Sequence, residues 1–265
     1  MKLHSTLTET NSAHPPLVLI HGLGSAATAF KPVVSALSKS FRVITIDIPG
    51  HGESPYTSGQ KMEPKALGSQ IFESISNEYG IENFHVSGNS LGGWIALEMA
   101  ADQPDRIMSV TGLAPAGLWL QPASGRLPSE ARSYYLAKAL KPLIKVGLKS
   151  QVMRSIGFSK VSPKWQKLSY ETCLDASVAM ATCSGYFPAW DGMLTRRFEA
   201  HVPESVPVTI LFGDSDNTLP YPDSQERSLA PAHASWLVID KCGHAPMWDH
   251  PQLIVQIIGE ATAKI

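Results

Sequence analysis

The chain has 265 residues, 43% of them hydrophobic and 17% charged, which supplies enough apolar material for a large core in one globular body. Its formal net charge of -1 gives no long-range field that would attract nucleic acid or an anionic membrane surface, so neither is an expected partner. The three cysteines, Cys173, Cys183 and Cys242, are odd in number and lack CxxC or CxxH spacing, which argues against a disulfide framework and a structural zinc site.

The N-terminal segment shows no targeting signal. Its first nine residues lack the apolar stretch of a signal peptide, and no later stretch has 18 uncharged apolar residues. We therefore expect a cytoplasmic protein with no stable membrane association. Only one strand, somewhere in 2–10, has room to form before Leu17.

Short apolar runs rich in β-branched residues recur along the chain, with helical segments between them. Because these runs are continuous rather than alternating, each is typical of a strand covered on both faces. They predict an α/β fold with a mostly parallel central sheet flanked by helices. The runs are 17–20, 42–47, 84–86, 107–113, 208–212 and 236–239. The helices expected among them are 30–38, 64–79, 91–101, 222–229 and 251–262.

The alternation of strand and helix stops between Ala114 and Val206. This segment of about ninety residues contains no convincing buried strand and is helical and patchily aromatic. We interpret residues 116–205 as an inserted helical lid, and residues 1–115 and 206–265 as the core that it interrupts. A set of ordinary packing helices is the alternative interpretation.

The pentapeptide Gly88-Asn89-Ser90-Leu91-Gly92 follows a β-rich run and opens a helical stretch. This context predicts a nucleophile elbow, in which a serine at a sharp strand-to-helix bend projects its hydroxyl into a site. The flanking glycines remove the Cβ atoms that would clash there. Ser90 is therefore the first catalytic candidate.

Acyl transfer by a serine also requires a base that takes the hydroxyl proton and an acid that orients the base. His244 is the base candidate, because it lies next to Gly243 in the loop after the last predicted strand, at the sheet edge where ligands bind in open α/β folds. Asp214 and Asp216 are the acid candidates. Both lie in the loop after the same strand, so position alone does not choose between them.

Several sequence motifs together resemble those of the α/β-hydrolase superfamily, and they are distributed over almost the whole length of the chain. Their order of serine, aspartate and histidine also matches that of the superfamily. The motifs are His21-Gly22-Leu23-Gly24-Ser25, Asp47-Ile48-Pro49-Gly50-His51-Gly52-Glu53-Ser54, Gly88-Asn89-Ser90-Leu91-Gly92-Gly93, Gly213 to Pro220 and Gly243-His244.

The resemblance implies roles for individual residues. In relatives with a G-x-x-D-x-x-x-P phrase the aspartate is the triad acid, which corresponds here to Asp216, and Asp214 is then a residue that holds the loop. The backbone amides of Leu91, which follows the nucleophile, and of Leu23 are the expected oxyanion donors. His21 is expected to hold the Leu23 loop by hydrogen bonding.

Substrate contacts are expected from aromatic and apolar residues near these motifs. Each of these side chains has core or lid packing as its alternative role, and Trp94, one turn into a buried helix, is expected to pack. The candidates for an apolar acyl or alcohol pocket are Trp119, Phe187, Trp190, Met247 and Trp248.

The resemblance implies a serine hydrolase that cleaves a carboxylic ester through an acyl-enzyme on Ser90. No metal or cofactor is expected, because the chain has no HExxH, no other ligand cluster at metal spacing and no complete GxGxxG. Similar constellations occur in C–C bond hydrolases and cofactor-free perhydrolases. A non-catalytic receptor for a small ligand on the same fold is the alternative from another class.

Overall fold

A seven-stranded sheet forms the centre of the molecule in a computed structural model, which describes residues 2–8, 13–123, 125–126 and 128–263. The strand order is β1-β3-β2-β4-β5-β6-β7. Strand β1 pairs antiparallel with β3, and every other neighbouring pair is parallel. The strands are β1 Ser5–Thr8, β2 Pro16–Ile20, β3 Arg42–Ile46, β4 Phe84–Asn89, β5 Ile107–Leu113, β6 Val208–Gly213 and β7 Ser235–Ile239. This sheet confirms the predicted α/β class.

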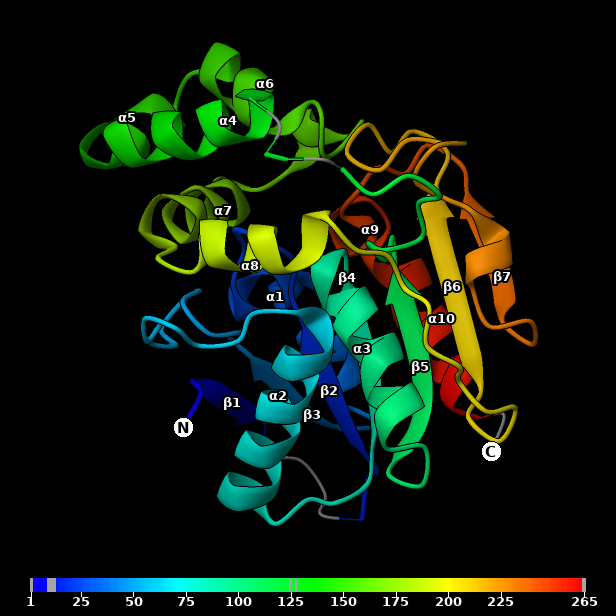
Figure 1. Ribbon diagram of the computed structural model, residues 1–265. Helices are drawn as coiled ribbons and strands as arrows, with labels where there is room; N and C mark the ends of the chain where they lie inside the picture. The colour runs from blue at the N-terminus through cyan, green and yellow to red at the C-terminus, as the bar shows by residue number, and fades with distance from the viewer. Residues whose placement is uncertain (1, 9–12, 124, 127, 264–265) are drawn as a thin grey trace.

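Helices cover both faces of the sheet (Figure 1). Alternate side chains of β2 belong to different cores: Val18 packs with residues of α2 and α3, whereas Leu19 packs with residues of α1 and α10. This alternation follows from the two-residue period of a strand, and both faces are apolar because both are covered. The flanking helices are α1 Lys31–Leu37, α2 Pro64–Tyr79, α3 Leu91–Asp102, the short α9 Pro246–Asp249 and α10 Pro251–Thr262. Within the described residues, no helix combines the length and apolar character needed to cross a membrane.

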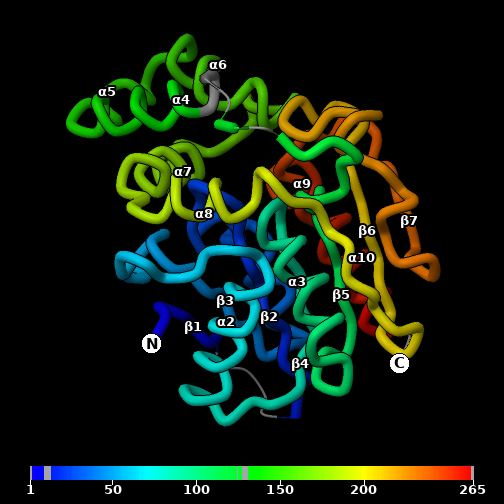
Figure 2. Tube along the Cα trace, viewed as in Figure 1, coloured from blue at the N-terminus to red at the C-terminus, as the bar shows by residue number. Residues whose placement is uncertain are grey.

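The segment between β5 and β6 contains helices that lie together at one end of the sheet (Figures 1 and 2). They are α4 Pro128–Ala139, α5 Ile144–Gly147, α6 Gln151–Phe158, α7 Tyr170–Thr182 and α8 Tyr186–Leu194. Their backbone contacts loops that follow the parallel strands: the Gly185 amide donates to the Gly50 carbonyl at 2.9 Å, and the His244 amide donates to the Val161 carbonyl at 2.8 Å. The inserted helices therefore rest on the carboxyl edge of the sheet. Their role as a lid stays a prediction.

The helix expected over 222–229 is wrong. The structure instead has turns followed by a single 3-10 turn, η4 Arg227–Leu229. Prolines at 220 and 222 have no N–H to donate, and the Gln225 side chain donates to the Leu219 carbonyl at 2.7 Å in place of a helical ladder. The local sequence thus favours turns rather than an α-helix in the segment after β6.

Candidate active site

The strand-to-helix bend at Ser90 is a strained one. Ser90 has φ 55° and ψ -118°, between the end of β4 and the start of α3. A Cβ atom on Gly88 would overlap the carbonyl of Gly92, and one on Gly92 would overlap the carbonyl of Ile20 in β2. Both glycines are therefore required by close backbone approach, and Ser90 is held at the end of the central strand.

We expect Gly92→Ala to lower the free energy of unfolding by more than about 3 kcal/mol, because the new methyl group meets backbone that cannot move aside. Gly259→Ala is the matched control: Gly259 lies within α10, and its Cβ would meet no atom within 4 Å. The control is expected to stabilise the protein by about 0.5–1 kcal/mol. Urea unfolding of the two variants measures both effects, and equal stabilities would contradict the expectation.

His244 and Asp216 form a buried pair. His244 Nδ1 donates to Asp216 Oδ2 at 2.8 Å, and both residues are buried. The other carboxylate oxygen of Asp216 accepts the backbone amides of Thr218 and Leu219, each at 2.8 Å. Asp214 is exposed, and its carboxylate accepts from the neighbouring Ser215 hydroxyl at 2.8 Å. The structure thus brings Asp216, not Asp214, to the histidine.

The histidine loop is fixed from two sides. Asn89, which precedes Ser90, donates its side-chain amide to the His244 carbonyl at 2.9 Å. From the insertion, the Val161 carbonyl accepts the His244 amide at 2.8 Å. Among the described residues the Ser90 hydroxyl makes no hydrogen bond to the His244 ring, so that contact stays a prediction; such bonds often tighten only when substrate binds.

The loop after β2 passes directly beside Ser90. A Cβ on Gly22 would lie 3.0 Å from the Ser90 Cβ. His21, fully buried, donates from Nδ1 to the Gly22 carbonyl at 2.8 Å and accepts the Ile48 amide at Nε2 at 3.1 Å, which holds the loop in place. Within the described part of the chain, the amides of Leu23 and Leu91 donate no hydrogen bond to protein. Both amides are therefore available to an oxyanion.

A second buried histidine, His51, has a measurable consequence for stability. Its Nδ1 donates to the Pro49 carbonyl at 3.0 Å, and burial, assisted by the charge of His21, lowers its pKa to about 3. Below about pH 6.5 the unfolded chain binds a proton at this position that the folded protein excludes. The free energy of unfolding should therefore fall by about 1.4 kcal/mol per pH unit from this group as the pH drops toward 3.

The check is urea unfolding between about pH 5.5 and 4.5, where the unfolded imidazole is charged and the folded one is neutral, for wild type and His51→Asn. We expect a pH slope smaller by one proton in the variant, with the exposed His201→Asn as control. An identical slope in wild type and His51→Asn would contradict this role of His51.

Sequence reasoning missed Asp249 and Ser162. Asp249, buried five residues after His244, accepts the Gly243 amide at 2.7 Å and the hydroxyl of Ser162, which is fully buried. Lys164 also donates to the Asp249 carbonyl, at 3.2 Å. An acidic residue shortly after the histidine was the available signal, but its partner lies 87 residues earlier, in the insertion.

The five expected substrate contacts lie in three places. Phe187 and Trp190 lie in an aromatic cluster of the insertion that packs on Leu23. Trp119 packs edge-on against Trp94 at 5.6 Å between ring centroids, and its indole donates to the Arg196 carbonyl. The remaining two take packing positions: Met247 is buried in the core beneath α1 and α10, and Trp248 packs against Phe158 and donates to the Ala29 carbonyl at 2.9 Å.

Cys242, two residues before His244, has a thiol of low reactivity. Burial, with the nearby Asp249 charge, raises the pKa of Cys242 to about 12, so the thiolate that would act as a nucleophile is rare at neutral pH. Within the described residues, no group of three or more His, Cys, Asp or Glu side chains is arranged to hold a metal ion. Ser90 is thus the nucleophile candidate at this end of the sheet.

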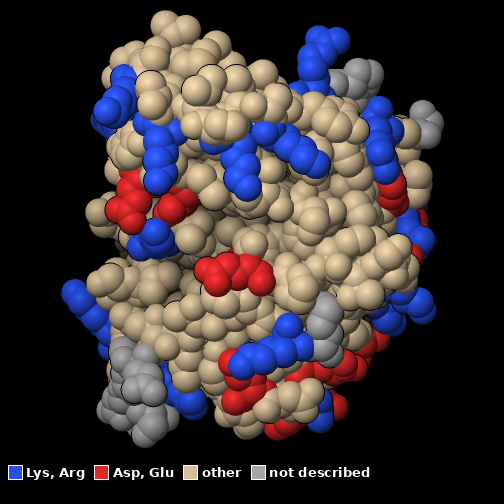
Figure 3. Space-filling view, turned by 90° about the vertical axis from the view of Figure 1, so that its left-hand side faces the viewer, with Lys and Arg blue, Asp and Glu red and all other residues tan. Residues whose placement is uncertain are grey.

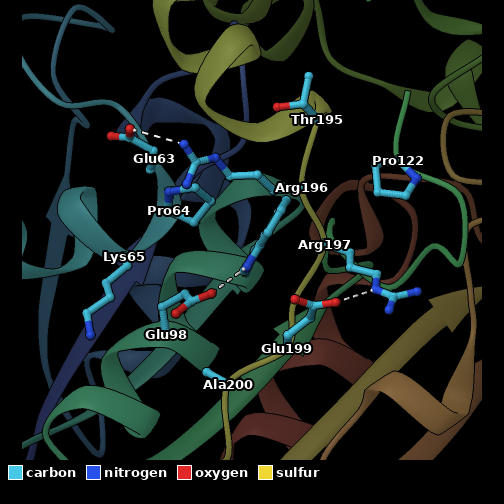
Figure 4. A pocket seen from close by; sticks show the side chains of 11 residues that line it. Glu63, Pro64, Lys65, Glu98, Pro122, Thr195, Arg196, Arg197, Glu199 and Ala200 are labelled. Carbon is cyan, nitrogen blue, oxygen red and sulfur yellow. Dashed lines mark hydrogen bonds and ion pairs between the residues drawn. The ribbon is translucent and has the colours of Figure 1, made fainter. Parts of the chain in front are cut away.

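A cavity of about 600 Å³ lies elsewhere, between α3, the start of α2 and the chain after α8 (Figure 4). Ser90, Asp216 and His244 are not among its lining residues. Arg196 points to Glu63, with a nitrogen 3.5 Å from the carboxylate, and Arg197 pairs with Glu199 at 2.8 Å (Figure 4). Because these arginines are paired with carboxylates, we assign the cavity no ligand.

Known proteins resemble the chain over most of its length. It is 28% identical over 254 residues to a pimeloyl-[acyl-carrier protein] methyl ester esterase of Aeromonas hydrophila, covering 92% of this chain and 94% of that one. It is 27% identical over 258 residues to a putative carbamate hydrolase, RutD, of Stutzerimonas stutzeri, covering 94% and 92%. The solved carboxylesterase CesB of Bacillus subtilis superposes with a TM-score of 0.70 at 16% identity, covering 98% and 91%. A family model described as the alpha/beta hydrolase fold matches residues 15–251, and the chain therefore belongs to the alpha/beta hydrolase family.

Proposed function

We propose that this protein is a serine hydrolase that cleaves carboxylic esters through an acyl-enzyme on Ser90. The observation that carries the proposal is the buried 2.8 Å hydrogen bond from His244 to Asp216, next to a strained serine at the end of β4. A carboxylate on Nδ1 leaves Nε2 of the neutral ring as the basic nitrogen. That nitrogen is the atom that would accept the serine proton.

The reaction would proceed in two halves. In the first, Nε2 of His244 takes the proton of the Ser90 hydroxyl while Oγ attacks the ester carbonyl carbon, and the amides of Leu23 and Leu91 stabilise the oxyanion. The carbon–oxygen bond to the alcohol then breaks, and the alcohol leaves with the proton from His244. In the second, His244 takes a proton from water, the hydroxide attacks the acyl carbon, and Ser90 leaves with that proton as the acid is released. Asp216 stabilises the histidine cation in both halves.

The relatives support hydrolysis of an ester or a related acyl compound. Two of the proteins described above are named as esterases and a third as a putative carbamate hydrolase. All three reactions attack a carbonyl carbon that bears a leaving group, which is the chemistry expected of a serine, histidine and aspartate set. The choice of a carboxylic ester as substrate is our inference.

The aromatic cluster of the insertion supports a substrate contact beside the oxyanion loop. The Tyr134 and Tyr186 rings stack at 4.7 Å, and Tyr186 meets Trp190 edge-on at 5.4 Å. The Trp190 indole nitrogen is buried and has no hydrogen-bond partner among the described residues. A buried indole N–H normally finds an acceptor, and a substrate oxygen would supply one here.

The test is hydrolysis of p-nitrophenyl acetate, butyrate and octanoate by the purified protein. We expect release of p-nitrophenol as a burst followed by a slower phase, because formation and breakdown of the acyl-enzyme are separate steps. A covalent adduct of acyl mass on the intact protein after a brief acid quench is the second readout. Absence of release above the blank for all three esters would rule out the esterase proposal and favour a receptor.

A further inference from the structure

Positive charge is concentrated in one segment of the chain. Residues 131–170 contain nine Lys and Arg and no Asp or Glu, whereas the other 225 residues contain 13 Lys and Arg against 23 Asp and Glu. The overall net charge of -1, from which we expected no attraction to an anionic membrane surface, is therefore the sum of +9 in this segment and -10 in the rest of the chain, and the uneven distribution changes that expectation. This segment forms most of α4, all of α5 and α6, and the connections to α7.

Exposed apolar side chains are concentrated in the same segment. Of the 13 large hydrophobic residues that are exposed among the described residues, eight lie in 131–170. The inner sides of α5 and α6 carry Ile144 and Phe158, which are buried in a cluster with Cys173 of α7. The exposed residues are Val146 on α5, Val152 and Ile156 on α6, and Leu143 at the end of the 3-10 turn Lys141–Leu143 that precedes α5.

The outward apolar residues follow helical spacing. Val152 and Ile156 are four residues apart on α6 and so share a helix face. Leu143 directly precedes α5, three residues before Val146. Val146 is 68% exposed and Val152 66% exposed, which means that these side chains project from the surface rather than line a groove. Removal of such projecting aliphatic groups from water by a partner lowers the free energy and so favours binding.

Exposed lysines lie close in sequence to these side chains. Lys141, Lys145 and Lys149 are exposed, and none of them forms an ion pair within the described residues. Figure 3 shows Lys and Arg with uncharged surface across the upper end of the molecule, where the inserted helices lie, whereas Asp and Glu appear lower down together with further Lys and Arg. We name Leu143, Val146, Val152, Ile156 and the three lysines the outer lid face.

We propose that the outer lid face docks the protein on a membrane surface that contains anionic lipid. Lysines with apolar residues between them are the pattern of helices that lie in a lipid interface, where the aliphatic groups enter the acyl boundary and the ammonium groups reach the headgroups. The charge of the remaining body, -10, would be repelled by the same surface, so only this end of the molecule can face it. The bound orientation turns the carboxyl edge of the sheet, with Ser90 and His244, toward the lipid.

The test is flotation of the full-length protein with vesicles of phosphatidylcholine alone or with about 30% phosphatidylglycerol. We expect binding to the anionic vesicles to be at least roughly tenfold tighter than to neutral ones and to weaken at 0.5 M NaCl. One variant, V146S/V152S/I156S, removes the apolar groups, and a second, K141E/K145E/K149E, reverses the charge. Each should reduce binding at least about fivefold.

Two control variants alter comparable groups away from this face. Val238→Ser changes an equally exposed valine on β7, and K39E/K61E reverses two exposed lysines outside the segment. Both should bind anionic vesicles as wild type does, and thermal melting shows that every variant is folded. Wild type that binds neither vesicle, or lid-face variants that bind like wild type, would overturn the proposal. Salt-sensitive binding to acyl carrier protein with none to vesicles would also overturn it, and would assign the face to an acidic protein.

Discussion

Ser90→Ala is expected to lower kcat for p-nitrophenyl butyrate by roughly a millionfold, to a residual rate set by binding and the oxyanion donors alone. The hydroxyl is the only group removed, and the variant should keep its fold because alanine adopts φ 55° no less readily than serine does. Single-turnover kinetics with active-site titration measure the loss. Wild type should also take up one equivalent of a phosphonate inhibitor, and the variant none.

Ser35→Ala is the matched control, because Ser35 is an exposed serine on α1 far along the chain from the elbow. It should retain wild-type turnover and phosphonate labelling. If Ser90→Ala kept more than about a hundredth of the wild-type rate, Ser90 would not be the nucleophile.

Asp216→Asn is expected to lower kcat by about ten-thousandfold with little change in KM. An amide in place of the carboxylate can donate to Nδ1 and so stabilises the wrong tautomer of His244, and it no longer balances the charge that forms on the ring. The other oxygen of Asp216 accepts the backbone amides of Thr218 and Leu219. The side-chain oxygen of asparagine can accept the same two hydrogen bonds, so the loop should stay folded.

Asp214→Asn provides the comparison within the same loop. Its carboxylate is exposed and accepts from Ser215 rather than from the histidine, so the variant should retain activity within about threefold of wild type. Measuring kcat and KM for the two variants side by side checks the choice of acid. A greater loss in Asp214→Asn than in Asp216→Asn would reverse the assignment.

The parts of the site that could be predicted from the sequence are those that depend on neighbouring residues. The elbow is one of them, because a serine between two glycines after a strand specifies a bend through local sterics, and Ser90 has the strained φ that such a bend requires. The choice between the two aspartates cannot be made from their position in the chain. Asp214 and Asp216 follow the same strand, and only the folded loop turns one carboxylate inward to the His244 ring.

Long-range contacts supplied the rest. Asp249 and Ser162 meet across 87 residues, and Val161 accepts the amide of His244 from within the insertion, so no local pattern could reveal either contact. The outer lid face also depends on long-range packing. Its lysines can be read from the sequence, but the exposure of the neighbouring apolar residues depends on which side of α5 and α6 packs on α7.

By itself, the sequence determined the α/β class, the strand order along the chain and the serine elbow. These depend on apolar periodicity and backbone sterics that act over a few residues. Local position left Asp214 and Asp216 equivalent, the superfamily resemblance selected Asp216, and the tertiary structure brings that residue to His244. Only the tertiary structure decided that Gly22 lies beside Ser90 and that residues 141–156 present an apolar and basic outer side. Those features arise when packing of the core brings distant segments together. The free energy of that packing comes from contacts between segments, so it cannot be read from any one of them.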